Sequence, residues 1–412
     1  MSRLEELITE LCPNGVEYLP LWSVTAWDKK FNSVDKSKQK KIIKYTYYLA
    51  ADLKQLECMN GNIKILTTSI TDLWANEADV SESMSEGEIV CIPWGGNPII
   101  QYYNGKFITG DNRIATSLDK RVLNNKYLYY SLQNRINDIS SFYRGSGIKH
   151  PDMAKVLDIQ IPVPPLEIQE EIVRILDNFT ELTAELTAEL TARKKQYEYY
   201  RTRLLVPQNA ELKWCRLGEI ADIGTGSSNT NEGLEEGLYP FYVRSQEVRR
   251  KNEYEFDETA IITAGDGVGV GKVLHYVDGK YALHQRAYRI HITDENVIPK
   301  YFYHYMKGTF LEYIGKAAVN SSVTSIRRKM LDDYPVPVPS VEIQNRIINV
   351  LDNFESICSD LNIGLPAEIE ARKKQYEFYR DALLTFAETG SIIAQTDRQT
   401  DRQTDRQTSI IR

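Results

Sequence analysis

Residues 161–179 read IPVPPLEIQEEIVRILDNF, and residues 336–354 repeat the same pattern as VPVPSVEIQNRIINVLDNF. Eleven of these 19 positions are identical. A second pair of segments, ARKKQYEYYRTRLL at 192–205 and ARKKQYEFYRDALL at 371–384, is identical at 11 of 14 positions. Because repetition at a fixed spacing indicates a duplicated structural unit, the chain contains two copies of one design, each about 175 residues long.

Each repeated block predicts a long helix that begins after a proline-rich segment, because prolines favour extended backbone and end a preceding helix. Apolar residues then recur at intervals of 4, 3, 4, 3 and 4, the heptad pattern of helices that pair lengthwise. These residues are Ile168, Ile172, Ile175, Phe179, Leu182 and Leu186 in the first copy, and Ile343, Ile347, Val350, Phe354, Ile357 and Leu361 in the second. Blocks 166–205 and 341–386 would each span roughly 60 Å, and Gly364 and Pro366 predict a kink or break in the second.

The two copies differ in the length of these blocks. Residues 180–191 of the first copy contain a four-residue Thr-Ala-Glu-Leu (TAEL) repeat, whereas the corresponding residues 355–370 are four residues longer. The difference equals one repeat unit.

Two regions, roughly 17–160 and 211–335, precede the predicted helices and are rich in Tyr, Val, Ile, Thr and Gly. Turn signals at Asn104-Gly105 and Asp278-Gly279 predict β-hairpins within mixed α/β domains. The two regions share an outline but little sequence, so one duplicated scaffold would hold two different globular domains.

Composition excludes several classes of protein. The chain has 412 residues with 42% hydrophobic and 26% charged residues, which is ordinary for a globular protein. It has no apolar run long enough for a transmembrane helix, and its amino terminus lacks the features of a signal peptide, so we expect a cytoplasmic protein. The five scattered cysteines and five histidines show no metal-binding spacing, and we expect no metal site.

The net charge of −7 by itself disfavours nucleic acid as a partner. The charge is unevenly distributed, however: residues 27–160 carry 18 Lys and Arg against 15 Asp and Glu, and residues 211–333 carry 16 against 18. Net charge therefore does not decide whether the chain binds DNA.

Two glycine-containing segments superficially resemble cofactor-binding loops. In Ala264-Gly-Asp-Gly-Val-Gly-Val-Gly-Lys272, Asp266 and Val273 stand where a Walker loop requires Gly and Ser or Thr, and Val270 breaks the dinucleotide pattern. A hairpin between strands is the simpler prediction, with a DNA-facing loop as the alternative. The corresponding Trp94-Gly-Gly-Asn-Pro98 lacks the features of an amino-methyltransferase motif.

Taken together, these motifs closely resemble the specificity subunit of type I restriction-modification enzymes. The resemblance extends to about residue 386 and rests on the P-x-P-x-x-E-I-Q entry (162–169 and 337–344), L-D-N-F (176–179 and 351–354), the TAEL repeat and A-R-K-K-Q-Y-E-x-Y-R-x-x-L-L, mostly in duplicate. It implies an α+β fold with two globular α/β target-recognition domains separated by two long antiparallel coiled-coil helices, in a pseudo-two-fold repeat. The expected boundaries are 1–160 and 207–335 for the two domains, and 161–206 and 336–386 for the helices.

The resemblance also implies a function. Each target-recognition domain would bind one half of a split double-stranded DNA sequence, and the subunit would be non-catalytic and hold no cofactor. It would recruit two methyltransferase subunits with S-adenosylmethionine, and through them restriction (motor) subunits that use ATP and Mg²⁺. Two alternatives are a methyltransferase or nuclease in its own right, and a coiled-coil interaction protein without DNA specificity.

Candidate DNA contacts are the basic, small polar and loop residues of the two globular regions, since Arg and Lys suit phosphates and guanine, and Ser, Thr and Asn suit phosphates or adenine. One cluster of such residues lies just before the proline-rich segment that precedes each predicted long helix. Lys36–Lys41 forms a further basic run. The candidates are Trp94, Asn97, Arg144, Ser146, Lys149, His150, Lys272, Ser321, Ser322, Thr324, Arg327, Arg328 and Lys329.

The carboxyl-terminal residues 387–412 include three Thr-Asp-Arg-Gln repeats, a polar composition that predicts disorder. Such a repeat can be encoded by a tetranucleotide tract. Slippage of this tract would shift the reading frame, so we interpret the tail as a sign of phase variation.

Overall fold

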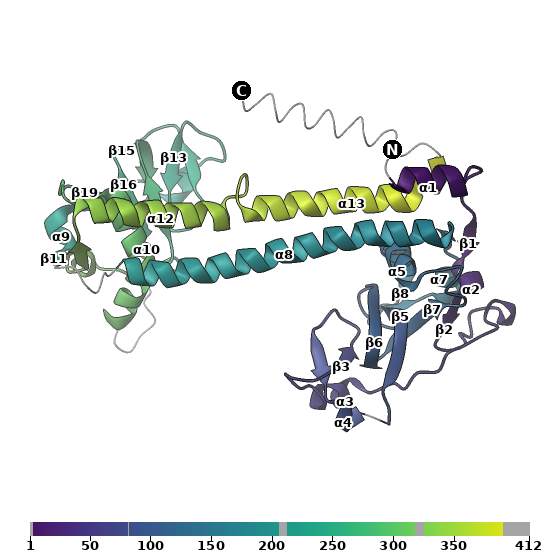
Figure 1. The fold of residues 1–412 in the computed structure, drawn as a ribbon. Helices are drawn as coiled ribbons and strands as arrows, with labels where there is room; N and C mark the ends of the chain where they lie inside the picture. The colour runs from purple at the N-terminus through teal and green to yellow at the C-terminus, as the bar shows by residue number, and fades with distance from the viewer. Residues whose placement is uncertain (1–2, 81, 206–211, 318–324, 390–412) are drawn as a thin grey trace. The chain divides into compact units, whose positions relative to one another are not determined.

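The computed structural model describes residues 3–80, 82–205, 212–317 and 325–389 (Figure 1). The chain divides into two compact units, unit 1 (Met1–Ala184 and Glu370–Arg412) and unit 2 (Glu185–Ile369), each described over the residues given above. The boundary falls inside the long helix α8 (Leu166–Leu204), which therefore contributes to both units. Among the described helices, none combines the length and hydropathy of a transmembrane span.

Unit 1 contains a six-stranded mixed sheet in the order β2-β7-β5-β6-β3-β4. Its strands are β2 (Thr25–Trp27), β3 (Ile63–Leu66), β4 (Leu73–Ala75), β5 (Ser85–Pro93), β6 (Gln101–Thr109) and β7 (Asn112–Ser117). Two small antiparallel pairs accompany it: β1 (Tyr18–Pro20) with β10 (Gln160–Pro162), and β8 (Tyr143–Arg144) with β9 (His150–Pro151). The short helices are α1 (Arg3–Leu11), α2 (Leu21–Val24), η1 (Lys36–Lys38), α3 (Ala50–Gln55), α4 (Glu77–Val80), α5 (Asn125–Asn134), α6 (Ile136–Ser141) and α7 (Met153–Leu157).

Unit 2 repeats this plan with a divided sheet. One sheet has the order β12-β19-β16-β17 and the other β14-β13-β18-β15. The strands are β11 (Lys213–Arg216), β12 (Ala221–Thr225), β13 (Tyr239–Tyr242), β14 (Arg249–Lys251), β15 (Phe256–Asp257), β16 (Ala260–Ala264), β17 (Leu274–Val277), β18 (Lys280–Leu283), β19 (Ala287–Ile292) and β20 (Pro335–Val338), with β11 paired to β20. The helices are α9 (Leu217–Ile220), η2 (Thr230–Glu232), α10 (Pro299–Ala317), α11 (Arg328–Asp332) and α12 (Val341–Ser359).

The strand pairing establishes which elements correspond. In unit 1, β7 lies between β2 and β5, and β3 runs parallel to β6. In unit 2, β19 lies between β12 and β16, and β13 runs parallel to β18. Strand β6 therefore corresponds to β17 and β18 together.

The hairpins predicted at two turn signals are wrong. Asn104-Gly105 lies within the continuous strand β6, where Gly105 pairs with Gly87. Asp278-Gly279 does interrupt the chain, but β17 pairs with β16 and β18 with β13 and β15, so the two flanking strands are not partners. Gly279 has φ +95°, which a glycine adopts without strain, and the chain bends there from one sheet into the next.

Identical side chains hold each long helix against its globular region. The buried Gln169 accepts a hydrogen bond from Asn124 N (2.9 Å) and donates to Val122 O and Pro164 O (both 2.7 Å). The equally buried Gln344 makes the same three contacts, with Ile298 N, Asn296 O and Pro339 O (2.7–2.8 Å).

Two buried tyrosines repeat this correspondence. Tyr127 donates to Pro162 O, and Tyr301 donates to Pro337 O, each at 3.0 Å. The E-I-Q entry and the proline segment are therefore a joint between helix and sheet in both units.

Helix α8 begins at Leu166 and has 39 residues, as predicted, which corresponds to roughly 58 Å. The predicted break in the second block is confirmed, because α12 ends at Ser359 and α13 (Leu365–Thr389) begins six residues later. At Gly364 an added Cβ would lie 2.5 Å from Ser356 O, so the tight turn at this break requires glycine.

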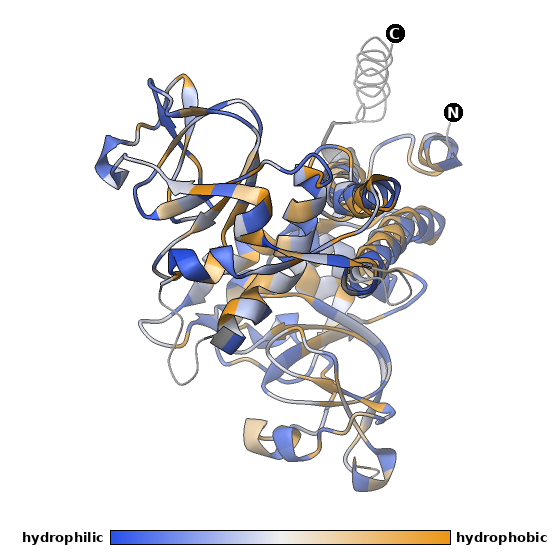
Figure 2. Cartoon of the chain, turned by 90° about the vertical axis from the view of Figure 1, so that its left-hand side faces the viewer, coloured by the Kyte–Doolittle hydropathy of each residue, from blue (hydrophilic) through white to orange (hydrophobic). Residues whose placement is uncertain are grey.

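The heptad seam is only partly correct. Ile168, Ile172 and Ile347 are buried, but Leu182, Val350, Ile357 and Leu361 are exposed. Leu176 and Leu351, which lie outside the predicted seam, are fully buried instead. The helices turn one face toward the globular region, and this contact, rather than a helix pair alone, determines which positions are covered. Figure 2 shows hydrophobic and hydrophilic residues alternating around the long helices.

A helix of the other copy packs against α8 in each unit (Figure 1). In unit 1, Phe179 of α8 stacks on Tyr379 of the antiparallel α13, with ring centroids 5.3 Å apart. In unit 2, Tyr200 of α8 stacks on Phe354 of the antiparallel α12 at 5.8 Å. Phe179 corresponds to Phe354 and Tyr200 to Tyr379 in the repeat, so the contact is reciprocal, as two-fold-related elements require.

Candidate DNA interface

Two loops that are distant in sequence meet in unit 1. One joins β5 to β6 (residues 94–100), and the other joins β8 to β9 (residues 145–149). Gly96 N donates to Lys149 O (3.0 Å), and His150 Nδ1 donates to Trp94 O (2.7 Å). The Trp94 and His150 rings also lie 5.4 Å apart. The structure therefore brings the two sequence-predicted clusters of this unit together.

Two cations, one of them buried, lie against the Trp94 ring. The Arg113 guanidinium lies 4.8 Å from the ring centroid and Lys29 Nζ lies 5.1 Å from it. Arg113 is itself buried and pairs with the buried Asp28 at 2.8 Å, while Tyr47 donates a hydrogen bond to the same carboxylate at 2.7 Å. A buried ion pair of this kind needs several partners to offset its desolvation, and Asp28, Arg113 and Tyr47 provide them next to the Trp94 loop.

The corresponding loops of unit 2 meet in the same way. The glycine segment joins the antiparallel strands β16 and β17 over residues 265–273, so the predicted hairpin is confirmed. Ile326 N donates to Gly265 O (2.7 Å), and Asp266 forms a β-bridge with Ser325. Gly269 packs so closely that an added Cβ would lie 2.4 Å from Arg244 O. The glycines serve close backbone packing here.

The chemistry at this position differs between the units. In unit 2 the loop carries Asp266, whose carboxylate accepts from Arg244 Nη1 (2.6 Å) and Arg286 Nη1 (3.1 Å). Burial raises the pKa of Asp266, but the hydrogen bonds from the two arginines outweigh it and leave the pKa below its usual value. Unit 1 thus presents an aromatic ring with cations, and unit 2 a carboxylate with two partly exposed arginines.

The sequence-predicted residues have different placements. Asn97, Arg144, Ser146, Lys149 and His150 are exposed around the half-exposed Trp94. In unit 2, Lys272 is exposed near the end of the glycine loop, and Arg327, Arg328 and Lys329 are exposed at the start of α11, where Arg328 pairs with Asp332 (3.1 Å). Ser321, Ser322 and Thr324 lie outside the described residues.

Several residues of these clusters were missed from sequence: Lys29, Asp28, Arg113, Arg244, Asp266 and Arg286. They lie on β-strands or in the connections between strands, and their partners are 20 to 85 residues distant. The only available signal was the position of Asp266 inside a glycine run that otherwise matched no cofactor motif.

One group of side chains in unit 2 has the composition of a metal site. His304, Asp352 and Glu355 could each direct one ligand atom to a common point. However, Lys307 Nζ lies 2.6 Å from Glu355 and Lys300 Nζ 3.6 Å from Asp352, so two ammonium groups already neutralise the carboxylates. Burial lowers the pKa of His304, whose Nε2 donates a hydrogen bond to Asp352 at 2.7 Å. The group corresponds to the Tyr130–Asp177 contact of unit 1 (2.6 Å). It has a structural role, because it connects α10 to α12.

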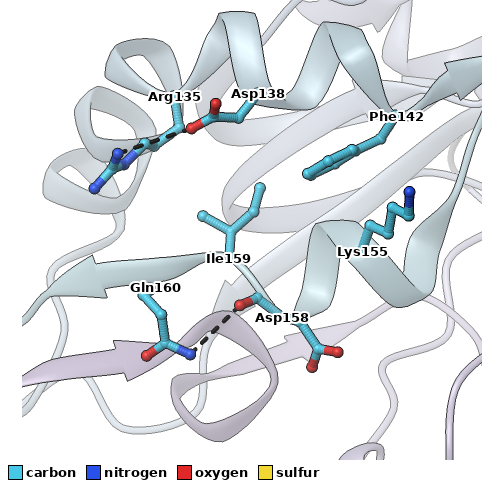
Figure 3. A pocket seen from close by; sticks show the side chains of 7 residues that line it. All are labelled: Arg135, Asp138, Phe142, Lys155, Asp158, Ile159 and Gln160. Carbon is cyan, nitrogen blue, oxygen red and sulfur yellow. Dashed lines mark hydrogen bonds and ion pairs between the residues drawn. The ribbon is translucent and has the colours of Figure 1, made fainter.

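A pocket of about 400 Å³ lies between α6, α7 and β10 of unit 1 (Figure 3). Its lining is Arg135, Asp138, Phe142, Lys155, Asp158, Ile159 and Gln160. Its charges are largely satisfied, because Arg135 pairs with Asp138 (3.8 Å) and Asp158 pairs with Lys38 (2.6 Å). The pocket has no cluster of chemically reactive groups.

Comparison with known proteins assigns the class. The family model for the type I restriction modification DNA specificity domain matches the chain twice, at residues 34–193 and 209–371. The chain belongs to this family.

Individual relatives agree with the assignment. The chain is 32% identical to the specificity subunit of the type I restriction enzyme EcoR124I/EcoR124II from Escherichia coli, over 95% of this chain and 99% of that protein. It is 31% identical to a putative type I restriction enzyme specificity subunit from Haemophilus influenzae, over 73% and 84% of the two chains. These names agree with the expectation of a non-catalytic DNA-recognition subunit.

Solved structures show the same fold. The S subunit of a type I restriction-modification system from M. genitalium matches with a TM-score of 0.58 and 16% identity, over 91% of this chain and 96% of that one. A chain from a structural study of complex assembly in a type I system matches with a TM-score of 0.53 and 14% identity, over 90% and 98%.

Proposed function

We propose that this specificity subunit binds a bipartite double-stranded DNA sequence, with each unit recognising one half. The observation that supports this most strongly is that the loop after β5 and the loop after β16 occupy the same topological position but carry different chemistry. A duplicated scaffold with different side chains at one equivalent position is suited to recognising two different half-sequences. Cationic and polar groups at both positions fit phosphates and base edges.

The long helices are the proposed attachment sites for two methyltransferase subunits. Leu182 and its repeat equivalent Ile357 are 45% and 39% exposed, and Tyr199 and its equivalent Phe378 are 53% and 44% exposed. Leu182 and Phe378 belong to unit 1, and Ile357 and Tyr199 to unit 2. Each unit therefore exposes one member of each repeat-related pair, and apolar side chains gathered on a folded surface mark partner-binding sites. Two equivalent sites fit two copies of one partner.

The catalytic chemistry would come from the partners. S-adenosylmethionine would bind to the methyltransferase subunits, and ATP and Mg²⁺ to the restriction subunits, with this chain supplying sequence recognition in the cytoplasm. The glycine loop, whose sequence departs from the cofactor-binding motifs, packs against Arg244 and Ile326.

The test uses the subunit assembled with its methyltransferase partner. Wild-type complex should bind DNA containing its target in a gel shift and transfer methyl groups from labelled S-adenosylmethionine. The variant Arg144→Ala/Lys149→Ala/Arg327→Ala/Arg328→Ala should bind more weakly, with roughly 1–3 kcal/mol lost for each residue that contacts a base. Equal DNA affinity of the variant and wild-type complexes across a salt series would show that these four residues are not part of the DNA interface. Methyl transfer by the isolated subunit would contradict the assignment of a non-catalytic role.

A further inference from the structure

The connection between two corresponding pairs of strands differs sharply between the units. Residues 28–62 connect β2 to β3 in unit 1, and residues 226–238 connect β12 to β13 in unit 2. The first connection carries eight lysines against four acidic residues, whereas the second carries three glutamates and no Lys or Arg. Seven of the eight lysines fall within residues 29–44, which we call the lysine segment.

Most of these lysines are not used by the fold. Lys36, Lys40, Lys41 and Lys44 are exposed, and none of the four has an ion pair or side-chain hydrogen bond within the described part of the chain. Lys38 differs, because its Nζ lies 2.6 Å from Asp158. Several lysines elsewhere in the unit are paired, such as Lys64 with Asp72 and Lys106 with Glu77. Free like charges on one segment repel one another, and a polyanion would relieve this repulsion.

The lysine segment is nevertheless held in a fixed conformation. Phe31 and Val34 are buried in the core of unit 1. Gln39 is also buried, and its side chain accepts from Phe31 N (2.8 Å) and donates to Lys29 O (3.0 Å). Asp35 accepts from Ser37 N (2.8 Å) at the start of η1. The free ammonium groups therefore extend from an ordered base, which reduces the entropy lost when they bind a ligand.

A small cavity lies beneath these lysines. It has a volume of about 150 Å³, and its lining includes Lys38, Lys40, Lys41, Ser37 and Trp22. Hydroxyl and ammonium donors are the groups that contact phosphate oxygens in protein–DNA complexes.

The lysine segment also continues into the candidate DNA interface of unit 1. Its first residue, Lys29, lies against the Trp94 ring. The side chain of Gln39, further along the segment, donates a hydrogen bond to the backbone carbonyl of Lys29. In unit 2, by contrast, Glu232 pairs with Lys251 (2.8 Å), and Glu235 and Glu236 are exposed. Those carboxylates would repel a phosphate backbone.

We propose that the lysine segment of unit 1 binds the phosphate backbone of the DNA beside the first half-site, and that unit 2 has no counterpart in the corresponding connection. The inference rests on the proposed function and adds that the two halves of the target are held with unequal electrostatic contributions. It concerns phosphates rather than bases, because long flexible ammonium groups act as point charges.

The experiment measures the affinity of the assembled complex for target DNA as a function of salt concentration. The variant Lys36→Gln/Lys40→Gln/Lys41→Gln removes three free charges without touching Lys38. Each lost phosphate contact should reduce the slope of log K against log salt by about 0.9. We expect a slope smaller by about two to three units and, at about 0.1 M salt, a loss of affinity of roughly ten-fold or more. The methylated sequence should stay the same.

Two control variants make the result specific. Lys36→Arg/Lys40→Arg/Lys41→Arg keeps the charges and should restore the slope. Lys54→Gln/Lys120→Gln/Arg121→Gln removes three charges elsewhere in unit 1 and should change the slope by less than one unit.

Three outcomes would overturn the inference: an unchanged slope in the Gln variant, an equal change in the remote control, or relaxed specificity at one base position. If the wild-type complex itself binds no specific DNA sequence, the proposed function fails instead, so the two failures are distinguishable.

Discussion

Units 1 and 2 are alike where the helices join the sheets and different where the loops project. Gln169 and Gln344 make the same three hydrogen bonds. At the corresponding loop, unit 1 has Trp94 between cations, and unit 2 has Asp266 between two arginines. The comparison shows that one set of contacts is kept in both units, while the loops carry different side chains, as the proposed recognition of two half-sequences requires.

The largest expected effect is confined to unit 1. Replacing Asp28 by Ala would remove the buried carboxylate that pairs with Arg113 and leave this guanidinium only its ion pair with the more exposed Asp111, and breaking a buried pair costs up to about 3–5 kcal/mol. Urea denaturation followed by tryptophan fluorescence measures this loss, because Trp22, Trp27, Trp74 and Trp94 lie in unit 1 and only Trp214 in unit 2. Asp138→Ala, which removes an exposed pair with Arg135 at 3.8 Å, is the control and should cost less than about 1 kcal/mol. A similar small cost for both variants would show that the Asp28–Arg113 pair does not stabilise unit 1.

A smaller effect should be equal in the two units. Gln169→Leu and Gln344→Leu each remove the partners of three backbone groups, and we expect each to cost about 1–3 kcal/mol. Hydrogen exchange of the residues around each joint measures the local loss of stability. Costs that differ by more than about 1 kcal/mol would mean that the two joints are not energetically equivalent.

The smallest expected effect is on the pH dependence of stability. It concerns the His304–Asp352 hydrogen bond of unit 2, whose counterpart in unit 1 is the Tyr130–Asp177 hydrogen bond. Burial lowers the pKa of His304 below its ordinary value of 6.5. The unfolded chain then binds protons more readily, so stability is fully present above about pH 6.5 and decreases as the pH falls through the lower folded pKa. The variant His304→Tyr, which copies unit 1, should lose less stability between pH 7.5 and 5.5, by up to about 1 kcal/mol. Thermal unfolding at several pH values measures the difference, and parallel pH profiles would refute it.

The sequence was sufficient to predict the duplication, the start of α8 at Leu166 and the break before α13, because prolines, glycines and repeated motifs act locally. Periodicity was less informative about burial. It identified an apolar side of each helix but not what covers it, so Leu182 and Leu361 were placed in a seam and are exposed, while Leu176 and Leu351 are buried against the globular regions.

Side-chain networks formed by distant residues could not be predicted. Asp28 and Arg113 are 85 residues apart and meet only because β2 and β7 pair. Asn104-Gly105 has the composition of a turn, yet β6 continues through it because β5 pairs with both residues, Glu88 with Asn104 and Gly87 with Gly105. Tertiary pairing overrode the local signal.

The continuous helix α8 connects the two units, each of which is a recognition unit under the proposed function. The TAEL repeat of α8 contains the boundary between the units at Ala184 and Glu185. Inserting one TAEL adds about 6 Å to the helix and rotates it by about 400°, so its apolar face keeps nearly the same direction. Since each base pair advances about 3.4 Å, the gap between half-sites should grow by one or two base pairs.

The most direct measurement is a map of methylated adenines across a genome that expresses the assembled complex with and without the inserted TAEL. The predicted result is a pair of unchanged half-sites separated by one or two additional base pairs. A two-residue insertion, which turns the apolar face by about 200°, should abolish methylation and serves as the control. An unchanged spacer, or altered half-sites, would contradict the account.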